Sequence, residues 1–152
     1  MKNLVLIASL ALSAVAFGQD AGGSQGVAPA REPASKAHVL TVAELDKALA
    51  DPGKVLLIDV RRPDEVSSIG GFPVYLSIQV KDLERSLDWI PRGRTIITVS
   101  NHAGRAGKAA DLLTAKGFKV LGAVGSQTYE QAGGKRVTHI PIPAPTTAAA
   151  TH

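Results

Sequence analysis

The stretch that decides the fold is Thr95-Ile96-Ile97-Thr98-Val99, followed by Ser100-Asn101-His102-Ala103-Gly104-Arg105. The first part is typical of a buried strand, and the second is a short turn that leads into an Ala-rich helix. Such a turn aims several backbone N–H groups, and the positive end of the helix dipole, at one spot. The sequence therefore predicts an anion-binding loop made of Ser100, Asn101, His102, Ala103, Gly104 and Arg105.

Ser100 stands where such a loop usually presents a cysteine nucleophile, and the chain contains no cysteine. A serine hydroxyl ionises far less readily than a thiol of pKa ~8.5. Ser100 therefore needs a neighbouring base to attack an acyl or phosphoryl centre. His102 is the only histidine in the loop, and we expect its side chain to point away from the loop centre. No acidic residue that would orient His102 is evident.

Helical and strand patterns alternate around this loop. A capping box at 41–44 predicts a helix, and the apolar run at 55–60 predicts a strand. Further along, we expect a helical stripe at Val80, Leu83, Leu87 and Ile90, the strand at 95–99, a helix ended by Gly117 and a strand at 119–124. This alternation predicts an α/β fold with a parallel sheet. Ligands of such sheets bind beyond the carboxyl ends of the strands, where the loop lies.

The two ends of the chain differ in composition from its middle. Residues 1–18 carry Lys2, a short apolar run and the small-x-small site Ala16-Phe17-Gly18, which predicts a cleaved signal peptide. We expect a flexible linker at 19–37, a folded domain at 38–143 and a disordered tail at 144–152. The protein is then periplasmic or secreted, with no stable membrane anchor after cleavage.

Three segments carry a family resemblance. Residues 57–65 read Leu-Ile-Asp-Val-Arg-Arg-Pro-Asp-Glu, 97–113 hold the strand, loop and helix around Ser100, and 125–133 end in Tyr-Glu-Gln-Ala-Gly. Together they resemble a rhodanese-like domain, with Ser100 at the position of the catalytic cysteine. Several positions differ from the family pattern: Gly71 stands where a histidine is usual, and Tyr129 replaces a tryptophan. In the loop and the start of its helix, Ala103 stands where a glycine is common and Ala106 where a serine is common.

The resemblance implies a three-layer α/β/α rhodanese-like fold with a mostly parallel five-stranded sheet. It also implies sulfurtransferase chemistry, in which a cysteine thiolate takes sulfur from a donor such as thiosulfate and holds it as a persulfide. Ser100 cannot form that persulfide. Arg61 resembles a family position that supports the loop from below. Asp59 is a second supporting candidate, which either orients the loop or pairs with Arg105 or Arg61.

Several kinds of partner are disfavoured. The four histidines show no metal-ligand spacing, so we predict no metal site, and no motif indicates a cofactor. The net charge of +4 comes from scattered basic residues, which favours a small acidic ligand or an acidic protein surface over nucleic acid.

Three functions remain. The first is an exported, non-catalytic rhodanese-like module that binds a small oxyanion, a sulfur-containing ligand or an envelope protein. The second is a sulfurtransferase-related or Ser-dependent hydrolytic enzyme with a non-cysteine site. The third is a purely structural interaction domain.

Overall fold

The computed structural model describes residues 34–141 of the 152-residue chain. The predicted signal peptide, most of the predicted linker and the predicted tail lie outside this range. Within it, no helix is both long enough and apolar enough to cross a lipid bilayer.

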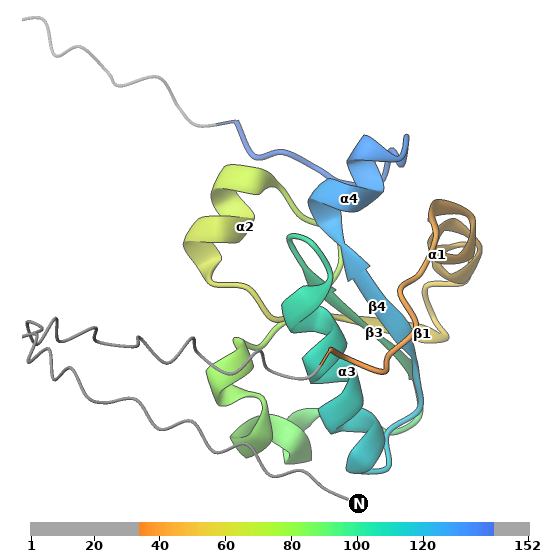
Figure 1. The fold of residues 1–152 in the computed structure, drawn as a ribbon, viewed down its shortest axis with the longest axis vertical. Helices are drawn as coiled ribbons and strands as arrows, with labels where there is room; N and C mark the ends of the chain where they lie inside the picture. Colours follow the sequence, from red (N-terminus) through yellow and green to blue (C-terminus); the bar gives the residue numbers. More distant parts are fainter. Residues whose placement is uncertain (1–33, 142–152) are drawn as a thin grey trace, which may run out of the picture. The chain divides into compact units, whose positions relative to one another are not determined.

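Helices and strands alternate along the described residues, as the sequence predicts (Figure 1). The four strands form one sheet in the order β2-β1-β3-β4, and every neighbouring pair is parallel. The predicted α/β fold with a parallel sheet is therefore confirmed. In chain order the elements are α1 (Val42–Leu49), β1 (Val55–Asp59), α2 (Pro63–Ile69), β2 (Leu76–Ser77), the 3-10 helices η1 (Val80–Asp82) and η2 (Glu84–Trp89), β3 (Thr95–Ser100), α3 (Gly104–Ala115), β4 (Val120–Gly125) and α4 (Ser126–Gln131).

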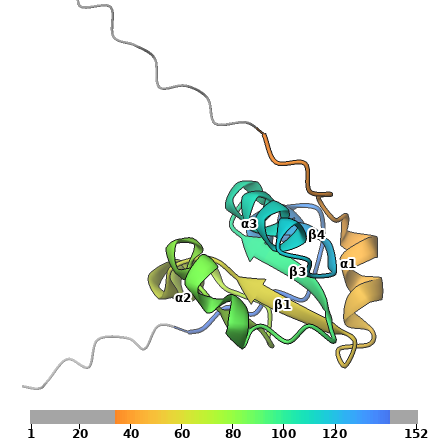
Figure 2. The same ribbon diagram turned by 90° about the horizontal axis from the view of Figure 1, so that it is seen from below.

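Each face of the sheet has its own hydrophobic core. Leu57 of β1 packs in a core with Leu45 of α1 and Tyr129 of α4. Ile58, the next residue of β1, packs on the opposite face with Leu113 of α3. Figures 1 and 2 show α1 and α3 on different sides of the strands. Because both faces are covered, β1, β3 and β4 are rich in apolar residues, and this composition predicted them in the sequence.

Within residues 34–141 the sheet has four strands, one fewer than the five expected. The segment before α1 pairs with β4 only through the single bridge Val39↔Ala123. The Leu40 N–H donates to the Ala123 carbonyl at 2.9 Å, and the next residue, Thr41, already caps α1. Because the Thr41–Glu44 capping box starts the helix there, the chain turns away before a strand can form.

The stripe at 80–90 forms two 3-10 helices instead of an α-helix. Leu83 N–H donates to the Val80 carbonyl at 3.3 Å, and Ile90 N–H donates to the Leu87 carbonyl at 3.2 Å. In each pair the two apolar residues are three positions apart, which is the period of a 3-10 helix. The end of α3 follows the prediction, since Gly117 has a φ of 79° there.

Candidate functional site

The loop predicted to bind anions lies at the carboxyl end of the sheet. β3 ends at Ser100 and α3 begins at Gly104, so only three residues join the strand to the helix (Figure 1). Ala103 has a φ of 64° and is the only non-glycine residue with a positive φ in the described part of the chain. This left-handed residue turns the chain sharply into α3.

Ser100 is buried inside this turn. Its side chain is on the α3 face, and its Oγ accepts a hydrogen bond from the Ala106 N–H at 3.1 Å. His102 is exposed, and no hydrogen bond joins it to Ser100 within residues 34–141. Since His102 does not contact the hydroxyl, the loop provides no base that would activate Ser100.

Four backbone N–H groups of the loop near Ser100 are unpaired in the described part of the chain. Within residues 34–141, the N–H groups of His102, Ala103, Gly104 and Arg105 have no hydrogen-bond partner. The next donor in the helix, the Gly107 N–H, is satisfied by the Ala103 carbonyl at 2.7 Å. The free donors stand at the positive end of α3, which is 12 residues long, so this end of the loop favours negative charge.

Arg105 belongs to the loop but already has an anionic partner. Its guanidinium donates to both carboxylate oxygens of Glu65, at 2.8 and 2.5 Å. Asn101 adds a third bond, from Nδ2 to Glu65 Oε1 at 2.9 Å. An external anion therefore competes with Glu65 for Arg105. Sequence reasoning missed Glu65 because it lies on α2, 40 residues before Arg105.

The ion pair fixes the charge of Glu65. Hydrogen bonds from Arg105, together with the Arg62 N–H, lower the pKa of the Glu65 carboxyl from 4.5 to about 2, against the opposing effect of burial. Glu65 in turn raises the pKa of Arg105. Both side chains are therefore charged at neutral pH.

Replacing Glu65 by Gln should lower the free energy of unfolding at pH 7 by about 1 kcal/mol, because a partly exposed bidentate ion pair is lost. A depressed pKa makes this contribution complete above pH 4.5, and it disappears as the pH falls towards 2. The free energies of unfolding of the parent and of Glu65→Gln, measured with urea, should therefore converge over that range. A difference that stays constant down to pH 2 would contradict the ion pair.

Asp59 and Arg61 form a buried ion pair beneath the loop. Arg61 Nε donates to Asp59 Oδ1 at 2.9 Å and Nη2 donates to Oδ2 at 2.6 Å, with both side chains at most 1% exposed. Arg61 Nη1 also donates to Asn101 Oδ1 at 3.2 Å and to Ser126 Oγ at 3.0 Å. Arg105 and Arg61 were both considered as partners for Asp59, and the structure shows the pair with Arg61. Through its bonds to Asn101 and Ser126, Arg61 connects β1 to the Ser100 loop and to α4.

Gly125 supports the loop from the neighbouring strand. A Cβ atom at this position would lie 2.8 Å from Ala103 N, Asn101 O and His102 Cα. The Gln127 N–H, in the first turn of α4, donates to the Asn101 carbonyl at 3.1 Å. The loop backbone therefore rests directly on the end of β4. Apart from the family resemblance around Gly125, nothing in the sequence indicated this contact.

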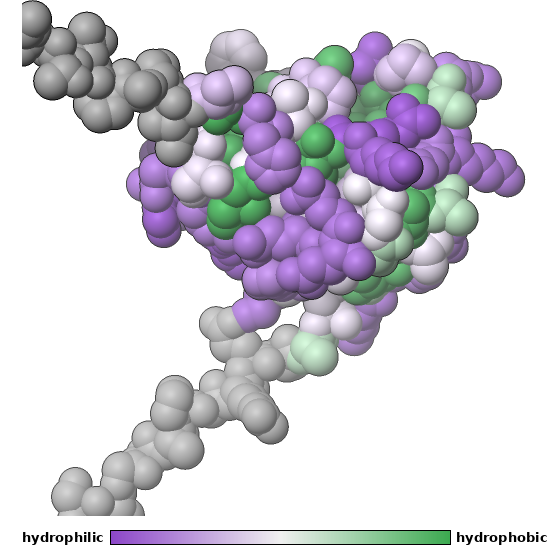
Figure 3. All heavy atoms as spheres, turned by 90° about the horizontal axis from the view of Figure 1, so that it is seen from above, coloured by the Kyte–Doolittle hydropathy of each residue, from purple (hydrophilic) through white to green (hydrophobic). Residues whose placement is uncertain are grey.

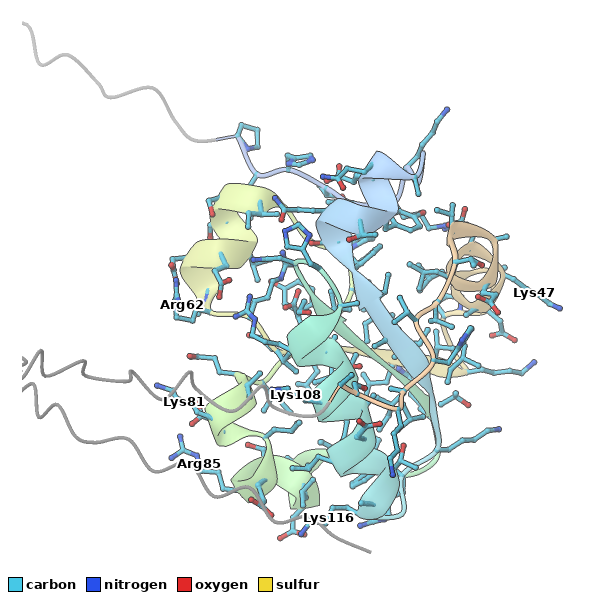
Figure 4. All side chains as sticks on the ribbon, in the orientation of Figure 1. Lys47, Arg62, Lys81, Arg85, Lys108 and Lys116 are labelled. Atoms are coloured by element: carbon cyan, nitrogen blue, oxygen red, sulfur yellow. The ribbon has the colours of Figure 1, made fainter. Side chains whose placement is uncertain are left out.

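The outer surface near the site is polar, with its charges dispersed. Figure 3 shows mainly hydrophilic residues on the face formed by α2 and α4, with small hydrophobic patches between them. Figure 4 shows Arg62 beside α2, where it pairs with Asp64 at 2.8 Å; Arg85 and Lys116 lie at the far end of α3 and pair with Asp82 at 2.8 Å and Glu84 at 3.2 Å. Within the described range, no group of His, Asp or Glu residues could hold a metal ion.

Comparison with known proteins gives matches among solved structures. No family model and no curated protein matches the chain. A rhodanese-related protein from Thermoplasma volcanium aligns at 20% identity over 66% of this chain and 97% of that one, with a TM-score of 0.58. Reduced CoADR-RHD from Bacillus anthracis aligns at 27% identity over 68% of this chain and 18% of that one, with a TM-score of 0.59.

A thiosulfate sulfurtransferase from Pseudomonas aeruginosa aligns at 22% identity over 68% of this chain, with a TM-score of 0.56. The chain spans only 20% of that enzyme's length. A further neighbour is a rhodanese-like domain protein from Staphylococcus aureus, at 20% identity over 68% of this chain and 98% of that one, with a TM-score of 0.56. The chain therefore has the fold of rhodanese-like domain proteins.

Proposed function

We propose that this protein is a rhodanese-like module that binds a small oxyanion or sulfur-containing anion at the Ser100 loop and does not transfer sulfur. The observation that carries the proposal is the state of Ser100. In a chain without cysteine, Ser100 ends β3 and its buried Oγ accepts the Ala106 N–H. We place Ser100 at the position of the catalytic cysteine. The donors remain for an anion, but the nucleophile of sulfur transfer is missing.

The surroundings of Ser100 also weigh against hydrolysis. Serine nucleophiles act when a neighbouring group takes their proton, and within the described residues Ser100 Oγ is bonded only to an N–H donor. Asp59 is held by Arg61 and cannot take that role without breaking the buried pair. A binding module therefore accounts for the loop better than an enzyme does.

We also propose that the protein is exported and works in the cell envelope, where its ligand or a partner protein would be found. The proposal rests on Lys2, the short apolar run that follows it and the Ala16-Phe17-Gly18 site.

The purified protein should produce no thiocyanate from thiosulfate and cyanide above the rate without protein, because no thiolate is present to carry sulfur. A cysteine-bearing rhodanese under the same conditions is the positive control. Ser100→Cys should gain a reactive thiol of lowered pKa at the N-terminal end of α3. Thiocyanate production by the parent protein would overturn the proposal.

Sulfate or thiosulfate should bind in the millimolar range, since a helix N-terminus and one charged hydrogen bond contribute only about 1 and 1.5–3 kcal/mol. Arg105→Ala should weaken binding, because it removes the cation and leaves Glu65 to repel the anion. Glu65→Gln should strengthen binding about tenfold by releasing Arg105. Titrations followed by amide chemical shifts of residues 101–106 would measure the anion affinity of the parent protein and of both variants.

Arg62→Ala is the matched control, since Arg62 is exposed and its main partner is Asp64 at 2.8 Å, while its Nη1 is 3.9 Å from Glu65 Oε2. It should bind the anion as the parent does. If neither the parent nor Glu65→Gln shows anion-dependent shifts in the loop, the domain has a structural or interaction role instead.

A further inference from the structure

A cavity of about 340 Å³ lies away from the Ser100 loop, beside the amino-terminal half of β1. Its apolar walls come from β1, from the end of α1 and from the loop at 72–74. None of its lining residues belongs to 100–105, so it is separate from the proposed anion site. Its volume lies at the lower end of the ~300–1,000 Å³ typical of small-ligand sites.

The cavity follows an open edge of the sheet. Val55 and Leu57 pack on the α1 face of β1, whereas Leu56 packs on the other face, yet all three line the cavity. A cavity that touches both faces of a strand must reach its edge. β2 pairs only with Ile58 and Asp59, so in the described part of the chain it leaves residues 55–57 without a neighbour on this side. The short β2 thus leaves room for a ligand.

The charged residues around the cavity are all basic. Arg94, Lys135 and Arg136 contribute to its lining, and no carboxylate does. Arg136 pairs with Asp46 at 2.9 Å. Within residues 34–141, the side chains of Arg94 and Lys135 have no ion pair or hydrogen bond. Two uncompensated cations beside apolar walls complement a molecule that is apolar at one end and anionic at the other.

The mouth of the cavity also presents apolar surface. Val74 lines it and is 76% exposed, and Pro73 beside it is exposed as well. Buried Phe72 extends this apolar wall inward. A ligand in the cavity would cover part of this surface, and each CH₂ group removed from water contributes about 0.8 kcal/mol.

We propose that this cavity binds a small amphipathic anion, a molecule with one short apolar chain or ring system and one carboxylate, sulfonate or phosphate group. The apolar body lies against Leu57, Phe72 and Val74, and the anionic group faces Arg94 and Lys135. This is a second binding function, and it does not depend on the Ser100 loop.

Titration with monomeric decanoate, followed by amide chemical shifts, tests the proposal. Saturable shifts are expected at 55–57, 72–74 and 135–138 and not at 101–105. The double variant Arg94→Ala/Lys135→Ala should bind decanoate at least about tenfold more weakly, since each lost charged contact is worth roughly a factor of ten. Decanol, which has the same chain and no charge, should bind the parent protein with similarly reduced affinity.

Lys47→Ala is the matched control, since Lys47 is a basic residue on α1 that does not line this cavity. It should bind decanoate as the parent does, and so should Arg105→Ala, which separates this test from that of the Ser100 loop. A comparison of decyl phosphate with decanoate shows which head group the site prefers. Binding of either anion that is tighter than binding of decanol supports the proposal.

Three results would overturn it: no saturable decanoate binding, equal binding by the double variant, or binding to vesicles of anionic phospholipid without binding to the monomer. The last result would indicate a membrane surface as the partner.

Discussion

Arg61→Ala should lower the free energy of unfolding by about 3–5 kcal/mol, one of the largest effects expected of any single side chain in this domain. The reason is the burial of the pair: the variant would leave the Asp59 carboxyl group 1% exposed with no cation beside it. The loss also removes the bonds to Asn101 and Ser126, so the Ser100 loop should become less ordered. Urea unfolding would measure the stability, and amide hydrogen exchange at 101–103 would report the loop.

Arg62→Ala is the matched control for this prediction, because it removes the neighbouring arginine from an exposed pair with Asp64. It should cost less than about 1 kcal/mol. The double variant Asp59→Asn/Arg61→Met should be more stable than Arg61→Ala, because it leaves no buried charge and the introduced amide oxygen can still accept the backbone N–H of residue 61. Equal losses for Arg61→Ala and Arg62→Ala would show that the pair is not buried in solution.

The parts of the fold that the sequence predicts are those with a local signal. β1, β3 and β4 are rich in apolar residues because both faces of the sheet are covered, and the capping box at Thr41 is complete in the structure. β2 left no signal because it has only two residues and pairs with only two of β1. Helix α4 was missed for a similar reason, since six residues with one buried aromatic ring are too few to show a period.

The sequence predicted only the part of the candidate site that lies in one continuous segment. The sequence places residues 100–105 in a strand, turn and helix, and the structure shows the buried Ser100 and the free N–H groups there. The sequence could not reveal that Glu65 holds Arg105, because that contact joins α2 to α3 and depends on how both helices pack on the sheet. This contact changes the chemistry expected of the loop, since its guanidinium is neutralised before any ligand arrives.

Gly125→Ala should cost about 3 kcal/mol and disrupt the Ser100 loop, because the new methyl group would lie 2.8 Å from three backbone atoms of residues 101–103. A side chain in that place could rotate away, but backbone cannot, and the Gln127 N–H ties the same segment to α4 at 3.1 Å. The loop must therefore shift outward, which would separate the N–H donors from Ser100. Sulfate titration and urea unfolding of this variant should both show the loss.

Gly104→Ala is the control from the same loop, because a Cβ atom there meets nothing within 4 Å and the residue begins α3. It should leave stability unchanged or raise it by a few tenths of a kcal/mol, since alanine favours the helix over glycine. It should also keep whatever anion affinity the parent has. If Gly125→Ala proved as stable as Gly104→Ala and kept its loop chemical shifts, the loop would not rest on β4, and the proposed rigid anion site would lose its support.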